Sequence, residues 1–261
     1  MSQCAICQRS SRRCVCQYLI SEPIKFNANL IIIQTQVEKD HPKNTGFFLT
    51  QNITSVQRIL IRLPSHHQPQ ESCLKLLHKT IKELEATHTN CLLLYPSKSR
   101  IGEMTEPNFI SASSDESLDK IKSLTSTEQS QLSLIILDMT WGHSQRFLAL
   151  CPRIAELPRY FLTKPEIDMF RTQLFNYPFT HNPYTLLRSG LRREHEISTF
   201  EAGLFALISL EFIQNSLPIF HQKKVTTLLK QQEIKKWQSL WQIYLDWLNS
   251  QATRINLIPK K

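Results

Sequence analysis

Glycine is scarce in this sequence, since only five of its 261 residues are Gly. No apolar run is followed by a Gly-x-Gly-x-x-Gly turn, and there is no Walker-type phosphate loop. These absences argue against a Rossmann dinucleotide site and against a P-loop. If the chain binds a nucleotide-like cofactor, we expect it to use a different kind of site.

Long apolar runs are also missing. No stretch reaches the roughly 18 consecutive apolar residues that a membrane span needs, and residues 1–13 are polar and cysteine-rich where a signal peptide needs an apolar run. The apolar fraction of 41% is that of an ordinary folded core. We therefore expect a soluble, cytoplasmic protein with no membrane contact, and the sequence implies no obligate protein partner.

Positive charge is in excess: 31 Lys and Arg face 22 Asp and Glu, which gives a net charge of +9. Such an excess favours polyanionic partners, because each neutralised phosphate releases condensed counterions. Many basic proteins never bind RNA, so the charge favours a nucleic-acid partner without establishing one.

Cysteine is concentrated at one end of the chain. Four of the seven lie within the first 16 residues, at Cys4, Cys7, Cys14 and Cys16. An odd count gathered at one end is not a disulfide framework, whereas four thiolates can close a tetrahedral shell around Zn(II). An iron–sulfur cluster and four unrelated thiols are the alternatives.

Apolar runs alternate with helical patterns along the chain. We expect strands at 29–34, 56–61, 91–95, 132–138 and 157–162, and helices at 44–52, 72–86, 142–150, 198–215 and 221–251. Residues 104–131 are polar and read partly as an exposed loop. Runs such as Leu-Ile-Ile-Ile are apolar on both faces, which predicts an α/β fold with a mostly parallel sheet and helices on both faces.

Asp138 ends the most apolar run and is followed by Met139, Thr140 and Trp141. Ligands of open α/β sheets collect at the carboxyl ends of strands, where a partly desolvated acid can accept a proton. The neighbouring hydroxyl and indole can hydrogen-bond to a ligand and stack on it. The alternative is that Asp138 only caps the next helix.

These residues resemble a known family. Asp138-Met-Thr-Trp141 is similar to the Asp-x-Thr-Trp signature of the DTW-domain family, and the four-Cys cluster resembles the zinc-binding start of that family. Further matches follow in order: His-Pro-Lys-Asn-Thr-Gly at 41–46, Leu-Tyr-Pro-Ser at 94–97, Leu-Arg-Arg at 191–193 and Ile-Ser-Thr-Phe-Glu-Ala at 197–202. The ordered set is more specific than any one of these short motifs.

The resemblance implies a fold and a reaction. The family is related to the SPOUT group, whose knotted loops hold S-adenosylmethionine without a Gly-rich turn. Characterised members make 3-(3-amino-3-carboxypropyl)uridine in tRNA. We therefore expect a zinc-binding segment at 1–23, a SPOUT-like catalytic domain at 24–216 and a helical extension at 217–261.

The implied reaction transfers the 3-amino-3-carboxypropyl group of S-adenosylmethionine to uridine N3 and releases methylthioadenosine. Asp138 is the expected base. The expected cofactor-binding residues are Tyr95, Pro96, Ser97, Thr140, Trp141, Ser198, Thr199 and Glu201; the expected RNA-binding residues are Arg188, Arg192 and Arg193. The alternatives are an RNA methyltransferase that uses the same cofactor and a non-catalytic, zinc-dependent RNA-binding module.

Two patterns also have structural explanations. Ser198-Thr-Phe-Glu201 fits a capping box before an apolar helix, and its helix start could also receive the cofactor carboxylate. Apolar and aromatic residues recur at helical spacing near the C-terminus, at Trp237, Leu240, Trp241, Tyr244, Leu245 and Leu248. We expect that stripe to pack against the domain rather than to stack on bases.

Overall fold

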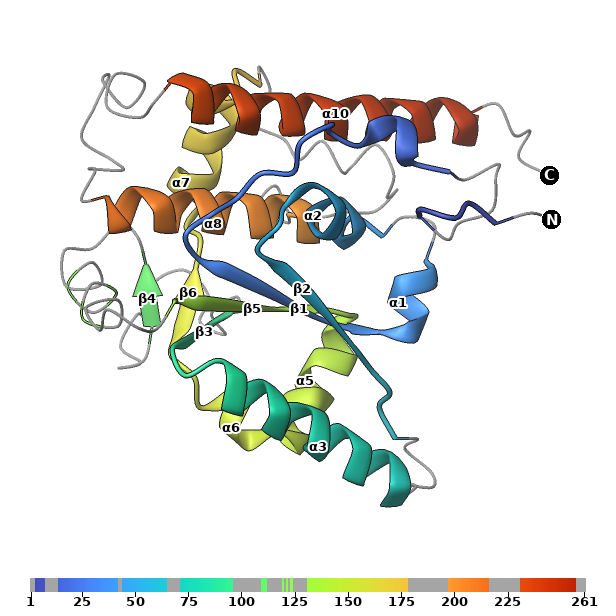
Figure 1. Ribbon diagram of the computed structural model, residues 1–261, viewed down its shortest axis with the longest axis vertical. Coiled ribbons are helices and arrows are strands. Elements are labelled where there is room, and N and C mark those ends of the chain that lie inside the picture. The colour runs from blue at the N-terminus through green and yellow to red at the C-terminus, as the bar shows by residue number, and fades with distance from the viewer. Residues whose placement is uncertain are drawn as a thin grey trace.

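The computed structural model describes residues 3–7, 14–41, 44–64, 71–95, 109–111, 119, 121, 123, 131–177, 197–215 and 231–256. Within these ranges a six-stranded sheet lies between two layers of helices (Figure 1). Every strand pairing in it is parallel. The expected α/β class with helices on both faces is therefore confirmed.

The sheet has the strand order β2-β1-β5-β3-β6-β4. Its strands are β1 (Asn29–Thr35), β2 (Val56–Ile61), β3 (Cys91–Leu94), β4 (Phe109–Ser111), β5 (Ser133–Asp138) and β6 (Arg159–Phe161). Five of them lie where the apolar runs predict. The strand β4 was not predicted, because it is three residues long within a polar segment and is defined only by its pairing with β6.

Helices cover both faces of the sheet. They are α1 (Gln36–Asp40), α2 (Gly46–Asn52), α3 (Glu71–Thr87), α5 (Trp141–Leu150), α6 (Pro152–Ala155), α7 (Lys164–Met169), α8 (Thr199–Gln214) and α10 (Gln231–Asn256). A 3-10 turn at Cys16–Tyr18 and a π-helical turn at Phe170–Leu174 complete the described elements. The helices expected at 44–52, 72–86, 142–150 and 198–215 are confirmed to within about one turn at each end.

Two hydrophobic cores explain why the central strands are apolar on both faces. In β1, Leu30 and Ile32 belong to the core that also holds α2, α8 and α10, whereas Ile31 and Ile33 belong to the core beneath α3, α5 and α6. Successive side chains of a strand point to opposite faces, so each face of β1 meets its own layer of helices.

The C-terminal helix α10 packs into the first of these cores. Trp237 stacks on Phe26 with ring centroids 5.8 Å apart, and Trp241 stacks on Phe175 at 4.8 Å. The expectation that this aromatic stripe packs against the domain is confirmed. Among the helices that the structure describes, none has the length and apolar character needed to cross a bilayer.

Candidate active site and metal centre

Asp138 is the last residue of β5, near the middle of the sheet (Figure 1). Its backbone register partner is Gln34, near the end of β1. Both side chains therefore lie at the carboxyl edge of the sheet, the edge at which open α/β folds bind their ligands. Asp138 is 9% exposed, so its carboxylate is largely shielded from bulk water.

Two side chains donate hydrogen bonds to the Asp138 carboxylate. The Gln34 side-chain amide donates from Nε2 to Oδ2, and the Thr199 hydroxyl donates to Oδ1 at 2.7 Å. Gly46, the first residue of α2, lies close to the same group, because a Cβ built on it would be 2.8 Å from Oδ2. Residues from β1, α2 and α8 thus converge on one carboxylate.

The helix that follows the motif is capped by Thr140 rather than by Asp138. The Thr140 side chain accepts a hydrogen bond from the His143 backbone N–H at 3.4 Å. The capping explanation of Asp138 is therefore wrong. The reason is that α5 begins at Trp141, so position 140 is the one whose side chain can reach the exposed N–H groups of the first turn.

Trp141 and Tyr95 form an aromatic stack beside this edge. Their ring centroids are 5.4 Å apart with planes 17° from parallel. The Tyr95 hydroxyl accepts a hydrogen bond from Gln145 at 2.7 Å, and the Arg159 guanidinium lies 5.5 Å from the Tyr95 ring centroid. Tyr95 is 4% exposed and burial raises the pKa of its phenol, whereas Trp141 is 55% exposed. Tyr95 therefore supports an indole whose other surface is open to a ligand.

The start of α8 is held by a buried polar network. Ser198 and Glu201 form a capping box, which confirms the structural explanation of that motif. Glu201 also makes an ion pair with Arg171 at 2.8 Å, with both side chains fully buried, and the Ser198 hydroxyl lies 2.9 Å from that of Tyr244. A cofactor role for Ser198, Thr199 and Glu201 stays a prediction.

The segment before α2 adds to this arrangement. Asn44 accepts a hydrogen bond from the Phe47 backbone N–H at 2.9 Å, and Thr45 accepts one from the Phe200 backbone N–H at 3.3 Å. The Asn-Thr-Gly segment at 44–46 therefore connects the starts of α2 and α8. Five predicted site residues lie outside the described residues: Pro96, Ser97, Arg188, Arg192 and Arg193.

The four N-terminal cysteines lie together. Their Sγ atoms are all within 4.8 Å of one another, with Cys4 and Cys16 at 3.5 Å and Cys7 and Cys14 at 3.9 Å. This group could hold a metal ion, so the alternative of four unrelated thiols is wrong. Backbone N–H groups of Cys7 and Ile6 lower the pKa of Cys4 to about 6, whereas burial and the neighbouring Cys4 raise the pKa of Cys16 to about 12. Without a metal ion, Cys4 is therefore the member of this pair that more readily becomes a thiolate.

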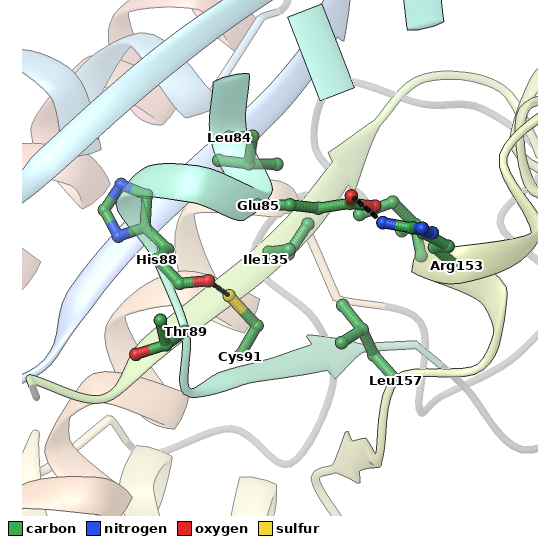
Figure 2. Close-up of a pocket in the computed structure, with 9 residues that line it drawn as sticks. Leu84, Glu85, His88, Thr89, Cys91, Ile135, Arg153 and Leu157 are labelled. Carbon is green, nitrogen blue, oxygen red and sulfur yellow. Dashed lines mark hydrogen bonds and ion pairs between the residues drawn. The ribbon is translucent and has the colours of Figure 1, made fainter. Parts of the chain in front are cut away.

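A separate cavity of about 340 Å³ opens at the other end of the strands (Figure 2). Its wall includes Cys91, the first residue of β3, together with Leu157 and the end of α3. An ion pair between Glu85 and Arg153 at 2.9 Å lies at this cavity. Because Asp138 is at the carboxyl end of its strand and Cys91 at the amino end of a parallel neighbour, the cavity is distinct from the Asp138 site.

Gln34 is the site residue that the sequence analysis missed. It follows four apolar residues and is 1% exposed. A polar residue ending an apolar strand at the carboxyl edge was the available signal, the same signal that marked Asp138. What the sequence lacked was the strand order, which alone makes β1 and β5 neighbours.

Comparison with known proteins identifies the family. The family model for the DTW domain matches residues 1–232 of the 261. No curated protein and no solved structure matches the chain. The match includes the cysteine cluster, the Asp-x-Thr-Trp motif and the start of α8, and the chain therefore belongs to the DTW-domain family, which acts on tRNA.

Proposed function

We propose that this protein transfers the 3-amino-3-carboxypropyl group of S-adenosylmethionine to N3 of a uridine in tRNA and releases methylthioadenosine. The observation that carries this proposal is the Asp138 carboxylate, held at the carboxyl edge by Gln34 and Thr199. It offers an oriented proton acceptor inside the Asp-x-Thr-Trp motif, which lies within the residues that the family model matches.

The proposed step requires one base. Uridine N3 is a poor nucleophile while it is protonated, so Asp138 accepts the N3 proton as N3 forms its bond to the γ-carbon of the methionyl chain. The carbon–sulfur bond breaks, and its electron pair stays on sulfur. The positively charged sulfonium of S-adenosylmethionine thereby leaves as neutral methylthioadenosine. Positioning of N3 in line with that carbon contributes alongside the base.

The surrounding residues supply binding in this proposal. The open face of Trp141 stacks on the cofactor beside Thr140, and Tyr95 holds the indole in place. Pro96 and Ser97, together with Ser198, Thr199 and Glu201 at the start of α8, complete the proposed SPOUT-like knotted cofactor site. Arg188, Arg192 and Arg193 contact tRNA phosphates.

Zinc is the proposed occupant of the cysteine group. The four converging sulfur atoms fit a tetrahedral thiolate shell. Four protein ligands leave no open position on the metal, so we assign this site a structural role rather than a catalytic one.

The product identity tests the proposal. Purified protein is incubated with unmodified tRNA and S-adenosylmethionine, and both the nucleosides and the spent cofactor are analysed by mass spectrometry. We expect methylthioadenosine and a uridine enlarged by the aminocarboxypropyl group. S-adenosylhomocysteine with a methylated nucleoside would instead identify a methyltransferase. Binding of tRNA without turnover of S-adenosylmethionine would indicate an RNA-binding module.

A further inference from the structure

Gln34 occupies a position that a purely structural explanation does not account for. It is 1% exposed and lies next to Asp138 on the neighbouring strand. Its Oε1 atom is buried and has no hydrogen-bond partner among the described residues. An unpaired buried acceptor costs about 1–3 kcal/mol, so the Oε1 atom of Gln34 carries a cost that the rest of this side chain has to offset.

The Nε2 atom of the Gln34 amide explains why this position is polar. This atom donates to Asp138 Oδ2, while Thr199 donates to Oδ1 from the opposite element, α8. One donor on each oxygen fixes the plane of the carboxylate as well as its position. Gly46 keeps the space beside Oδ2 open, since any Cβ there would come too close.

The chemical nature of the donor also matters. A Lys or Arg at position 34 would form an ion pair with Asp138 and would make the carboxylate a weaker proton acceptor. A neutral amide also stabilises the ionised carboxylate through its hydrogen bond, but it orients the group without placing an opposite charge beside it. A glutamine therefore suits a carboxylate that must accept a proton.

We propose that Gln34 is a positioning residue that orients the Asp138 carboxylate toward the N3 proton of the target uridine. This inference rests on the proposed function. Gln34 acts through Asp138, and its loss should lower the rate of transfer without weakening the binding of either substrate.

The test compares Gln34→Met, which keeps the length of the side chain and removes the donor, with Ser209→Ala. Ser209 is a matched control, because it is about as buried as Gln34 and lies away from the site. It accepts a hydrogen bond from the Tyr160 hydroxyl, with the two oxygens 2.7 Å apart. We expect Gln34→Met to lower kcat about 10- to 100-fold, less than the roughly 100- to 10,000-fold contribution of a general base, because Asp138 itself is still present, with both KM values changed less than about threefold. Ser209→Ala should leave kcat close to that of the wild type.

A second substrate separates positioning from a general structural defect. In tRNA that contains 5-fluorouridine, N3–H is more acidic and depends less on a base. The loss caused by Gln34→Met should therefore shrink on this substrate, as should the loss caused by Asp138→Asn. An equal loss on both substrates, or a kcat within about twofold of the wild type on normal tRNA, would overturn the proposal.

The effect of Gln34 on Asp138 can also be measured without any turnover, by NMR of the Asp138 carboxyl group. This measurement does not depend on which reaction the protein catalyses. In protein with ¹³C-labelled aspartate carboxyl groups, the Asp138 resonance is assigned by its absence in Asp138→Asn. Gln34→Met should move this resonance and Ser209→Ala should not. An unmoved resonance contradicts the role of Gln34 whatever the reaction, whereas a wild type that makes no methylthioadenosine contradicts the proposed function itself.

Discussion

Gln34 and Thr199 are neutral donors to the Asp138 carboxylate, and this allows its charge to be removed while these two contacts are kept. In Asp138→Asn the new side-chain oxygen can still accept from Thr199. The new NH₂ group can donate to Gln34 if the Gln34 amide turns to present Oε1, the atom that has no described partner. The substitution therefore isolates the loss of charge and basicity.

We expect Asp138→Asn to lower the transfer rate about 100- to 10,000-fold at saturating substrates. The melting temperature and the affinity for S-adenosylmethionine should stay close to those of the wild type. Single-turnover assays with tRNA, together with calorimetry, check this. A loss smaller than about threefold would contradict a catalytic role for Asp138.

Trp141 differs from the other three tryptophans in its exposure. It is 55% exposed, whereas Trp237, Trp241 and Trp247 are at most 3% exposed. In the proposed site its open face stacks on the cofactor, and an aromatic stack of this kind contributes about 1–3 kcal/mol. We therefore expect Trp141→Ala to raise the Kd of S-adenosylmethionine about 5- to 150-fold, and Trp141→Phe to retain most of the affinity.

Tryptophan fluorescence provides the measurement, because an added ligand can reach Trp141 but not the three buried indoles. S-adenosylmethionine should change the emission of the wild type and have little effect on Trp141→Phe. If the two proteins respond equally to the cofactor, the assignment of Trp141 to its site is wrong.

The π-helical turn at Phe170–Leu174 and helix α8 are joined by the buried ion pair between Arg171 and Glu201. Removing one partner of a buried pair leaves the other charge in a place where water cannot solvate it, which typically costs about 3–5 kcal/mol. We expect Glu201→Gln to lower the free energy of unfolding by about that amount in urea titrations.

The exposed pair between Lys164 and Asp168 on α7 is the matched control, at 2.6 Å and with side chains 47% and 28% exposed. Asp168→Asn should cost less than about 1 kcal/mol. The double variant Arg171→Met with Glu201→Gln should recover much of the stability lost in Glu201→Gln, because it removes both charges. If Glu201→Gln and Asp168→Asn lowered the free energy of unfolding by similar amounts, burial would not determine the contribution of these ion pairs to stability.

The N-terminal turn contributes Cys7 and Val15 to the same core as α10. We expect freshly purified protein to contain one zinc per chain, and Cys4→Ser or Cys16→Ser to lower that content, because a hydroxyl is a much poorer zinc ligand than a thiolate. Cys73→Ser is the control, since Cys73 lies on α3 outside the cluster.

Elemental analysis measures the metal, and a chelator should lower the melting temperature of the wild type through the linkage between metal binding and folding. Wild-type protein free of zinc would refute the assignment. Iron with acid-labile sulfide in its place would identify an iron–sulfur cluster.

The whole molecule carries a net charge of +9, and this should set the salt dependence of tRNA binding. Each phosphate neutralised by a Lys or Arg contributes about −0.7 to −0.9 to the slope of log K against log salt. Replacing Arg188, Arg192 and Arg193 by Gln in one variant should therefore reduce the magnitude of this slope by about 2 to 3.

Binding isotherms between about 50 and 200 mM salt give this slope. Three Lys→Gln changes at Lys75, Lys79 and Lys82 on α3 remove the same charge elsewhere and form the control. A slope near zero for the wild type would contradict phosphate-dominated binding. Equal changes in the two triple variants would assign the effect to net charge rather than to Arg188, Arg192 and Arg193.

Local patterns in the sequence were sufficient to predict most of the longer elements and the family. The apolar runs gave five of the six described strands and the parallel α/β class, because a strand buried on both faces must be apolar throughout. The cysteine spacing and the Asp-x-Thr-Trp motif are likewise local, and so they could be read without a structure.

Only the tertiary structure decided which of these residues meet. Gln34 and Asp138 are 104 residues apart in sequence, and Thr199 and Asp138 are 61 apart. Their contacts depend on β1 lying beside β5 and on α8 beginning at the carboxyl edge, and these are long-range outcomes of packing. The same holds for the partner of Glu201, because a buried Arg171 is favourable only where the fold places a carboxylate beside it.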